Sequence, residues 1–206
     1  MASRARIQAV AAATLATASS VAAIVVDRLR PEMSVAEQII AVLGVSIVLY
    51  LAYSATESVL RRVYYRHVRG RWHYVTVAPS GGNQNYAVMD IGFTEEGTLK
   101  YEVQLHRNPA ELKTHENAIG SAISEAMDYD PKRRELHILY DVDLKEDKDR
   151  RRGRLRMTRN LDGTMTGMWT SVRNEKEISR GEVFAARPAQ FDAKSTRWLK
   201  LREIER

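Results

Sequence analysis

The chain has 206 residues and contains no cysteine, which excludes a disulfide-stapled exported domain. Lys and Arg number 32 against 26 Asp and Glu, and the surplus of +6 lies wholly in residues 61–206, because residues 1–60 hold four basic and four acidic residues. A basic domain attracts anionic lipid headgroups or an anionic ligand, and charge alone does not choose between them.

Two apolar segments dominate the first sixty residues. Residues 7–26 and 38–56 contain no ionisable side chain, and at about 1.5 Å rise per residue each is long enough to cross a hydrocarbon core of roughly 30 Å. The polar segment between them contains Pro31, and Ser34 is placed to cap the second helix. The pattern predicts a transmembrane helical hairpin over residues 1–60.

The first apolar segment also has the features of a cleaved secretory signal peptide, with Arg4 and Arg6 ahead of it. A cleaved peptide leaves only one anchor, whereas small residues on both segments favour two helices packed together in lipid. Five arginines follow the second segment between residues 61 and 71, against Arg28 and Arg30 in the turn. Because Lys and Arg are retained on the cytoplasmic side, we expect both termini to be cytoplasmic, with residues 61–69 forming a basic juxtamembrane linker.

From residue 70 onward the periodicity alternates, which predicts short antiparallel strands. Eight runs have this pattern: 71–77, 86–93, 98–105, 118–129, 135–142, 153–159, 164–171 and 182–187. Turn residues or charged runs join them, including residues 145–152. No crossover helix separates any pair, so we expect an all-β, eight-stranded antiparallel up-and-down barrel over residues 70–188. Residues 189–206 predict a short amphipathic helix, lying on the barrel or on the membrane surface.

No catalytic constellation emerges from the sequence. The five histidines lack metal-ligand spacing, and no Gly-rich phosphate loop precedes a predicted helix. We therefore expect a binding protein, neither an enzyme nor dependent on a cofactor. An eight-stranded barrel has room for packed side chains or for one small ligand. Trp72, Tyr74, Tyr101, Tyr140 and Trp169 stand at positions that would face the interior, where aromatic side chains more often form core.

Gly70-Arg71-Trp72 at the start of the first strand and Arg187 at the end of the last resemble the Gly-x-Trp and closing Arg of lipocalin-like barrels. The resemblance implies that the arginine lies across the tryptophan and closes one end of the barrel. Trp72 and Arg187 are accordingly expected to be structural residues.

The whole arrangement resembles the membrane-anchored β-barrel effectors of CBASS, the bacterial cyclic-oligonucleotide-based antiphage signalling systems. It consists of two N-terminal transmembrane helices, an arginine-rich segment and a compact eight-stranded barrel. The resemblance implies a multi-pass protein of the bacterial inner membrane whose barrel binds a cyclic dinucleotide made by a partner nucleotidyltransferase (CD-NTase). It further implies homo-oligomers on activation, disruption of the membrane in abortive infection, and no DNA or RNA partner.

Aromatic faces stack on nucleobases for roughly 1–3 kcal/mol each, and arginines make charge-assisted contacts with phosphates. The candidates for base stacking are Tyr74, Tyr86, Tyr101 and Tyr140, and those for phosphate binding are Arg107, Arg154 and Arg156. Two alternatives use the same barrel: a membrane-tethered lipid or fatty-acid-binding protein, and a ligand-free scaffold that meets a partner protein through its basic face.

Overall fold

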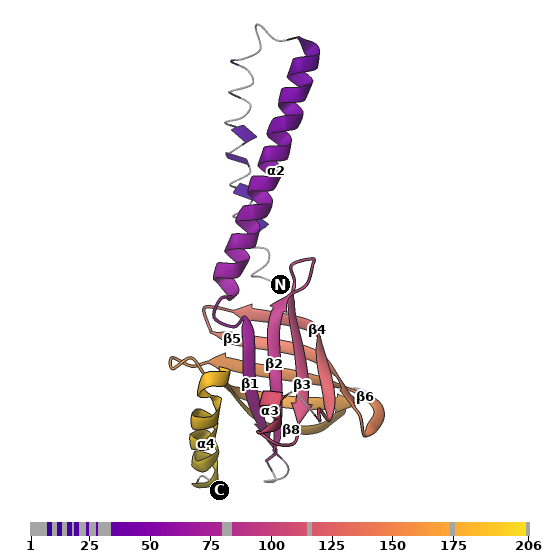
Figure 1. Ribbon diagram of the computed structural model, residues 1–206, viewed down its shortest axis with the longest axis vertical. Helices are drawn as coiled ribbons and strands as arrows, with labels where there is room; N and C mark the ends of the chain where they lie inside the picture. Colours follow the sequence, from indigo (N-terminus) through magenta and orange to yellow (C-terminus); the bar gives the residue numbers. More distant parts are fainter. Residues whose placement is uncertain are drawn as a thin grey trace. The chain divides into compact units, whose positions relative to one another are not determined.

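The computed structural model describes residues 34–79, 84–114, 117–173 and 176–204, together with isolated positions between residues 8 and 28. The chain forms two compact units, Met1–His67 and Val68–Arg206. The first contains the long helix α2, and the second contains the β-strands and the C-terminal helix (Figure 1).

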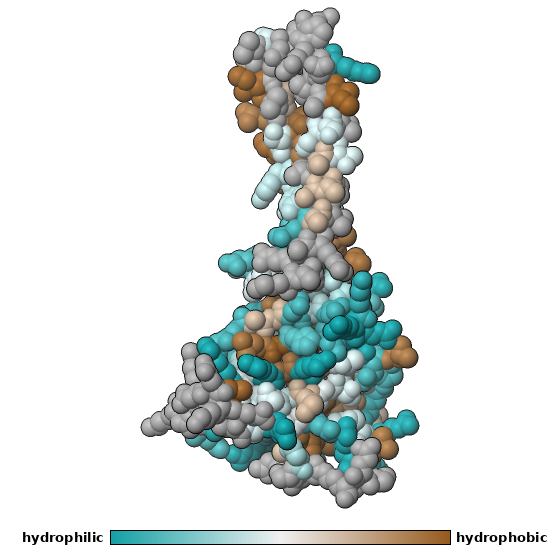
Figure 2. All heavy atoms as spheres, turned by 180° about the vertical axis from the view of Figure 1, so that it is seen from behind, coloured by the Kyte–Doolittle hydropathy of each residue, from teal (hydrophilic) through white to brown (hydrophobic). Residues whose placement is uncertain are grey.

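Helix α2 (Val35–Tyr65) begins at the predicted cap. Ser34 and Glu37 form a capping box in which each side chain bonds the other residue's backbone N–H. Within α2 the segment Ile39–Tyr65 is long and apolar enough to cross a membrane, and brown and pale side chains cover much of its surface (Figure 2). Because the helix continues to Tyr65, the predicted linker over residues 61–69 is helical in its first half.

The first predicted span, residues 7–26, falls mostly outside the described residues. Its described positions are helical, and the Thr17 and Ser20 hydroxyls donate to the carbonyls of Ala13 and Ala16, four residues earlier. This bond lets a hydroxyl side chain sit in an apolar helix without an unsatisfied group. Among the described residues one helix is long and apolar enough to span a bilayer, and the second span stays a prediction.

Eight antiparallel strands form a closed barrel, as the alternating pattern predicted. Each strand pairs with the next, and β8 pairs with β1 to complete the ring. The strands are β1 (Gly70–Val77), β2 (Asn85–Phe93), β3 (Leu99–His106), β4 (Gly120–Asp130), β5 (Glu135–Leu144), β6 (Asp147–Arg159), β7 (Met165–Arg173) and β8 (Lys176–Ala186).

The turn predicted over residues 145–152 is too long. Strand β5 ends at Leu144 and β6 begins at Asp147, so Lys145 and Glu146 form the turn and the rest of the charged run belongs to β6. Register partners explain this, since residues 152–158 of β6 pair with both β5 and β7, which satisfies their backbone groups whatever the charge of the side chains. Composition identified the run as polar, but cross-strand pairing determined its conformation.

Alternation along the strands divides the barrel into an inner and an outer face. On β1, Trp72 and Tyr74 point inward opposite Met89 and Ala87 of β2. A β-bulge between Ser124 and Ala126 shifts the register of β4 by one residue, which changes which residues of that strand face inward. The predicted inward direction of the odd-numbered residues of β3 agrees with the burial of Tyr101 and Val103.

A second apolar cluster lies on the outer wall, beneath helix α4 (Pro188–Ile204). Phe191 of α4 is 1% exposed and packs with Val75 and Phe184 of the barrel, while Trp198 stacks on Phe184 with ring centroids 5.5 Å apart. The one-turn helix α3 (Glu111–Thr114) adds Leu112 to the same cluster. The C-terminal helix therefore lies on the barrel, which decides between its two predicted positions.

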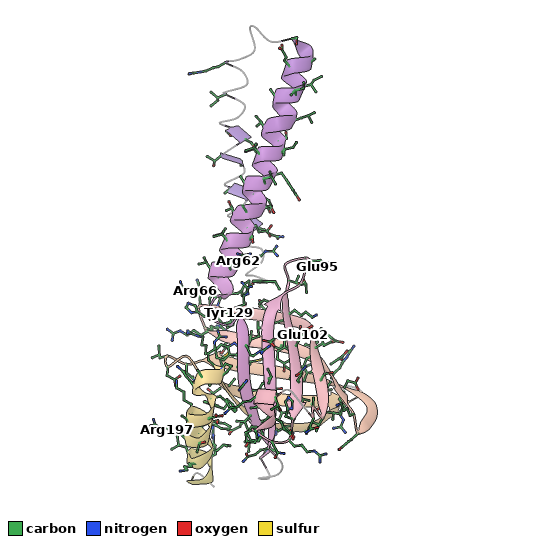
Figure 3. The ribbon with its side chains drawn as sticks, viewed as in Figure 1. Arg62, Arg66, Glu95, Glu102, Tyr129 and Arg197 are labelled. Atoms are coloured by element: carbon green, nitrogen blue, oxygen red, sulfur yellow. The ribbon has the colours of Figure 1, made fainter. Side chains whose placement is uncertain are left out.

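Trp72 and Arg187 close one end of the barrel, as the resemblance to lipocalin-like barrels implied. The Arg187 guanidinium lies 3.9 Å from the centre of the Trp72 ring, and the indole N–H donates to the Val68 carbonyl over 2.7 Å. Gly70 has φ +101°, and a Cβ there would be 2.9 Å from Arg187 Nη1. We call this the closed end; Glu95, in the β2–β3 turn, also lies there (Figure 3).

Candidate functional site

A cavity of about 220 Å³ lies inside the barrel, toward the end opposite Trp72. Thr76, Asn85 and Leu144 line it, and each stands at or next to the end of its strand. We call this the cavity end. The described residues that line it are Tyr74, Thr76, Asn85, Leu105, Ala122, Tyr140, Val142, Leu144, Arg151, Trp169, Ser171 and Ser179.

Two glycines make room for aromatic rings in this wall. Tyr140 pairs across the sheet with Gly153, and Trp169 pairs with Gly181. A Cβ at Gly153 would lie 2.3 Å from Tyr140 Cζ, and one at Gly181 would lie 2.7 Å from Trp169 Nε1. Each ring therefore lies across the bare backbone of the neighbouring strand, which holds it against the wall and leaves the centre of the barrel open.

Three predicted tyrosines meet inside the barrel. The Tyr74 and Tyr101 hydroxyl oxygens are 3.4 Å apart, and the ring centroids of Tyr101 and Tyr140 are 5.7 Å apart. Burial raises the pKa of Tyr74 to about 12 and also raises the pKa values of Tyr101 and Tyr140. All three hydroxyls are therefore protonated at neutral pH and able to donate hydrogen bonds.

The three tyrosines have different places in the site. Tyr74 and Tyr140 line the cavity, so a ligand there would touch them. Tyr101 is fully buried and does not belong to the lining. Its hydroxyl contacts the Tyr74 hydroxyl. We therefore correct the predicted role of Tyr101 from stacking on a base to supporting Tyr74.

Arg151 brings a cation into the lining, and sequence reasoning missed it. The sequence pattern predicts a turn over residues 145–152, although Arg151 shares odd numbering with Leu155 and Met157, which are buried. Extending that alternation backward along β6 would have placed Arg151 on the inner face. Among the described residues, the lining contains no carboxylate and also carries the hydroxyls of Thr76, Ser171 and Ser179, so the cavity suits an anionic ligand with hydrogen-bonding groups.

Tyr86 lies on the outer wall, so its predicted role in base stacking is corrected. On β2 the odd positions Ala87 and Met89 face inward, which directs Tyr86 outward by strand alternation. There it packs against the outer cluster beneath α4, and its hydroxyl donates to Gln84 Oε1 over 2.7 Å.

Arg154 and Arg156 also point outward. We therefore correct the prediction that they bind phosphate in the cavity. They alternate along β6 with the buried Leu155 and Met157. Arg156 pairs with Glu135 over 2.8 Å, and 63% of its side chain is exposed. These arginines belong to the charged outer wall, much of which is hydrophilic in Figure 2.

Arg107 stands at the cavity end, just beyond the end of β3. Its guanidinium donates to both carboxylate oxygens of Glu146, in the β5–β6 turn, over 2.7 and 2.8 Å. Both side chains are largely exposed, at 61% and 73%, so the pair contributes little to stability. Arg107 does not line the cavity, although it lies at the same end of the barrel.

A larger hollow of about 370 Å³ lies on the outer wall over β1–β4. Its centre is a cross-strand row of Arg71, Asp90, Glu102 and Ile123, and Glu102 is labelled in Figure 3. Arg71 and Asp90 pair with each other over 3.1 Å. The mixed charges already neutralise one another at this surface, so the internal cavity is the better ligand site despite its smaller volume.

No protein-family model and no curated protein matches this chain. Within the described residues, no group of three or more His, Asp or Glu side chains is placed to hold a metal ion. The assignment of function therefore rests on the chemistry of the cavity and on the apolar helix.

Proposed function

We propose that this protein is a membrane-anchored sensor whose barrel binds a cyclic dinucleotide made by a partner nucleotidyltransferase in bacterial antiphage defence. The observation that carries the proposal is the lining of the cavity. It combines the aromatic rings of Tyr74, Tyr140 and Trp169 with the guanidinium of Arg151, and none of the lining residues that the structure describes is a carboxylate.

The lining matches the two chemical parts of a cyclic dinucleotide. Tyr140 and Trp169 present rings held against glycine backbone, and a base stacked on an aromatic face gains roughly 1–3 kcal/mol. Arg151 supplies a charge-assisted donor for a phosphate oxygen. A saturated acyl chain uses neither stacking nor the row of hydroxyls, so this lining favours the nucleotide over the fatty-acid alternative.

The size of the cavity implies that only part of the ligand enters it. Pockets that enclose drug-sized ligands measure roughly 300–1,000 Å³, and this cavity measures about 220 Å³. One base with its adjoining phosphate would occupy the cavity. The second half of the ligand would then stay at the cavity end, near Arg107, which would exchange Glu146 for a phosphate.

Helix α2 supplies the connection to the membrane. Its apolar segment Ile39–Tyr65 is long enough to cross a bilayer, and with the first apolar segment it would form the predicted two-span anchor of the inner membrane with cytoplasmic termini. A ligand that favours clustered barrels by about 2–4 kcal/mol, summed over several subunits, would convert monomers into homo-oligomers. Association of the anchors would then disrupt the bilayer and stop phage replication by killing the cell.

The test is a thermal-shift and calorimetric panel of cyclic dinucleotides on the full chain in detergent micelles. We expect one or more members to raise Tm and to bind saturably. Arg151→Gln should weaken that binding by about 10- to 150-fold, the factor that a charged hydrogen bond contributes. The matched control is Arg154→Gln, which removes an outward arginine three residues away and should leave affinity unchanged.

Three results would overturn the proposal. The first is a folded wild-type chain whose Tm and calorimetric trace respond to no cyclic dinucleotide. The second is an acyl chain recovered by mass spectrometry from the purified protein, which would favour the lipid carrier. The third is equal weakening by Arg151→Gln and Arg154→Gln, which would indicate a nonspecific charge effect.

A further inference from the structure

The indole of Trp169 differs from the other buried indole of the barrel in its hydrogen bonding. Trp72 Nε1 donates to the Val68 carbonyl over 2.7 Å. Trp169 Nε1 is also shielded from solvent, yet it has no hydrogen-bond partner among the described residues. A buried donor left without an acceptor is unfavourable, so a ligand group that accepts a hydrogen bond from it would remove this cost on binding.

The position of Trp169 connects this donor to the ligand site. The residue lines the cavity, and its Nε1 is the atom that a Cβ at Gly181 would approach to 2.7 Å. Two residues along β7 and β8, Ser171 and Ser179 pair directly across the sheet and line the same cavity. Trp169, Ser171 and Ser179 therefore bring an indole N–H and two hydroxyls together as a polar strip on β7 and β8, in a lining that also contains Thr76, Asn85 and Arg151.

The edge of a nucleobase carries groups that can form hydrogen bonds with such a polar strip. These groups include carbonyl oxygens and ring nitrogens that accept hydrogen bonds, in a pattern that differs from base to base. An indole N–H only donates, whereas a serine hydroxyl donates or accepts. The indole is therefore the member of the strip that requires an acceptor on the ligand.

We infer that the barrel reads one base of its ligand through the Trp169 indole N–H, which donates a hydrogen bond to an acceptor on the edge of the base. This inference rests on the proposed function and deepens it. It makes Trp169 a specificity-determining residue, and Ser171 and Ser179 its polar neighbours on the same base. Tyr74, Tyr140 and Arg151 bind any base with its phosphate, and Trp169 selects among bases.

The direct test observes the indole N–H itself. The full chain, labelled with indole ¹⁵N-tryptophan in detergent micelles, has three indole resonances, from Trp72, Trp169 and Trp198, assigned by single Trp→Phe variants. The probe is the panel of cyclic dinucleotides containing A, G, C and U. On saturation with the tightest member, the Trp169 indole proton should shift downfield, while that of Trp198, on the outer wall, should stay in place.

The second arm measures selectivity. Trp169→Phe keeps an aromatic ring over Gly181 and removes the donor, so it should weaken binding of the preferred member by about 3- to 12-fold, the factor of one neutral hydrogen bond. Affinity for the other cyclic dinucleotides should fall less. The difference in affinity between the preferred ligand and the others should therefore become smaller. Trp198→Phe is the matched control, and both the affinities and the order of preference should be retained.

The outcomes separate this inference from the proposed function. If the wild type binds a cyclic dinucleotide while the Trp169 resonance stays in place, or if Trp169→Phe keeps affinity and preference, the inference is wrong and the proposed function survives. A variant that lowers only Tm would show that the indole serves the fold, bonding for example the Val77 carbonyl, which also approaches Gly181. If no cyclic dinucleotide binds the wild type, both fail.

Discussion

At the residue scale, glycines decide where the aromatic rings of the cavity lie. Gly153 and Gly181 stand directly opposite Tyr140 and Trp169 on neighbouring strands, and each ring occupies the space that a side chain would fill. Strand alternation shows which side of the sheet a residue faces, but the position of the ring on that side depends on what its cross-strand partner leaves free.

Gly153→Ala tests this arrangement. The added Cβ would lie 2.3 Å from the Tyr140 ring, so the ring must move, and overpacking of this kind costs about 1–3 kcal/mol. We expect Tm of the barrel to fall by about 3–12 °C and ligand affinity to fall with it, both measured on the full chain.

The matched control for this variant is Gly92→Ala on β2. A Cβ there would meet nothing within 4 Å, so Tm should stay constant or rise slightly, because alanine restricts the unfolded chain. Equal losses of stability in the two variants would show that strand glycines matter through backbone freedom, and the proposed packing of Tyr140 would be rejected.

At the scale of elements, helix α4 is part of the barrel's stability. It covers Val75 and Phe184 on the outer wall, and Lys194 of α4 bonds Asp162 in the β6–β7 turn over 3.1 Å. Helix α4 therefore contacts the first strand β1, the last strand β8 and the β6–β7 turn. A barrel fragment that stops at Arg187 would expose this outer cluster to water.

The turn contact predicts a dependence of stability on pH. Hydrogen bonds from Thr164, followed by the charge of Lys194, lower the pKa of Asp162 to about 2. Since the folded-state pKa lies below the ordinary value near 4, ionised Asp162 stabilises the fold above about pH 4, and this contribution is lost as the pH falls toward 2. The gain is small, under about 1 kcal/mol, because 55% of the carboxylate side chain is exposed.

The measurement compares urea unfolding of the wild type and Asp162→Asn at pH 6 and at pH 2.5. The wild type should be the more stable at pH 6, and the difference should shrink toward zero at the lower pH. A difference of the same size at both values would mean that the carboxylate charge has no part in holding the turn.

At the scale of the whole molecule, the described lining residues of the cavity all belong to the compact unit Val68–Arg206, and the apolar helix belongs to the other unit. Under the proposed function, binding and anchoring would therefore be encoded in separate parts of the chain. The boundary is sharp, because the Val68 carbonyl accepts the hydrogen bond of the Trp72 indole and must stay with the barrel.

Removing residues 1–67 should separate the two activities. We expect a chain that begins at Val68 to stay in the supernatant after ultracentrifugation of lysed cells, while the full chain sediments with membranes. The truncated chain should keep the Tm shift with its cyclic dinucleotide and lose any growth arrest caused by the full chain. A truncated chain that still arrests growth would contradict the role of the anchor.

The resemblance to lipocalin-like barrels implied the contact of Trp72 with Arg187. The sequence by itself determined the helix cap at Ser34, the apolar length of the second segment and the eight antiparallel strands. These features depend on local patterns, namely hydrophobic period, capping and turn residues, which a linear chain displays directly. Only the tertiary structure decided that the charged run before Gly153 is strand, that Arg151 lines the cavity while Arg154 and Arg156 do not, and that Tyr86 belongs under α4. Closure of the sheet determines which face of each strand points into the barrel, and docking of α4 determines which part of the outer face is covered. Both depend on contacts between residues far apart in the chain, which a local pattern does not display.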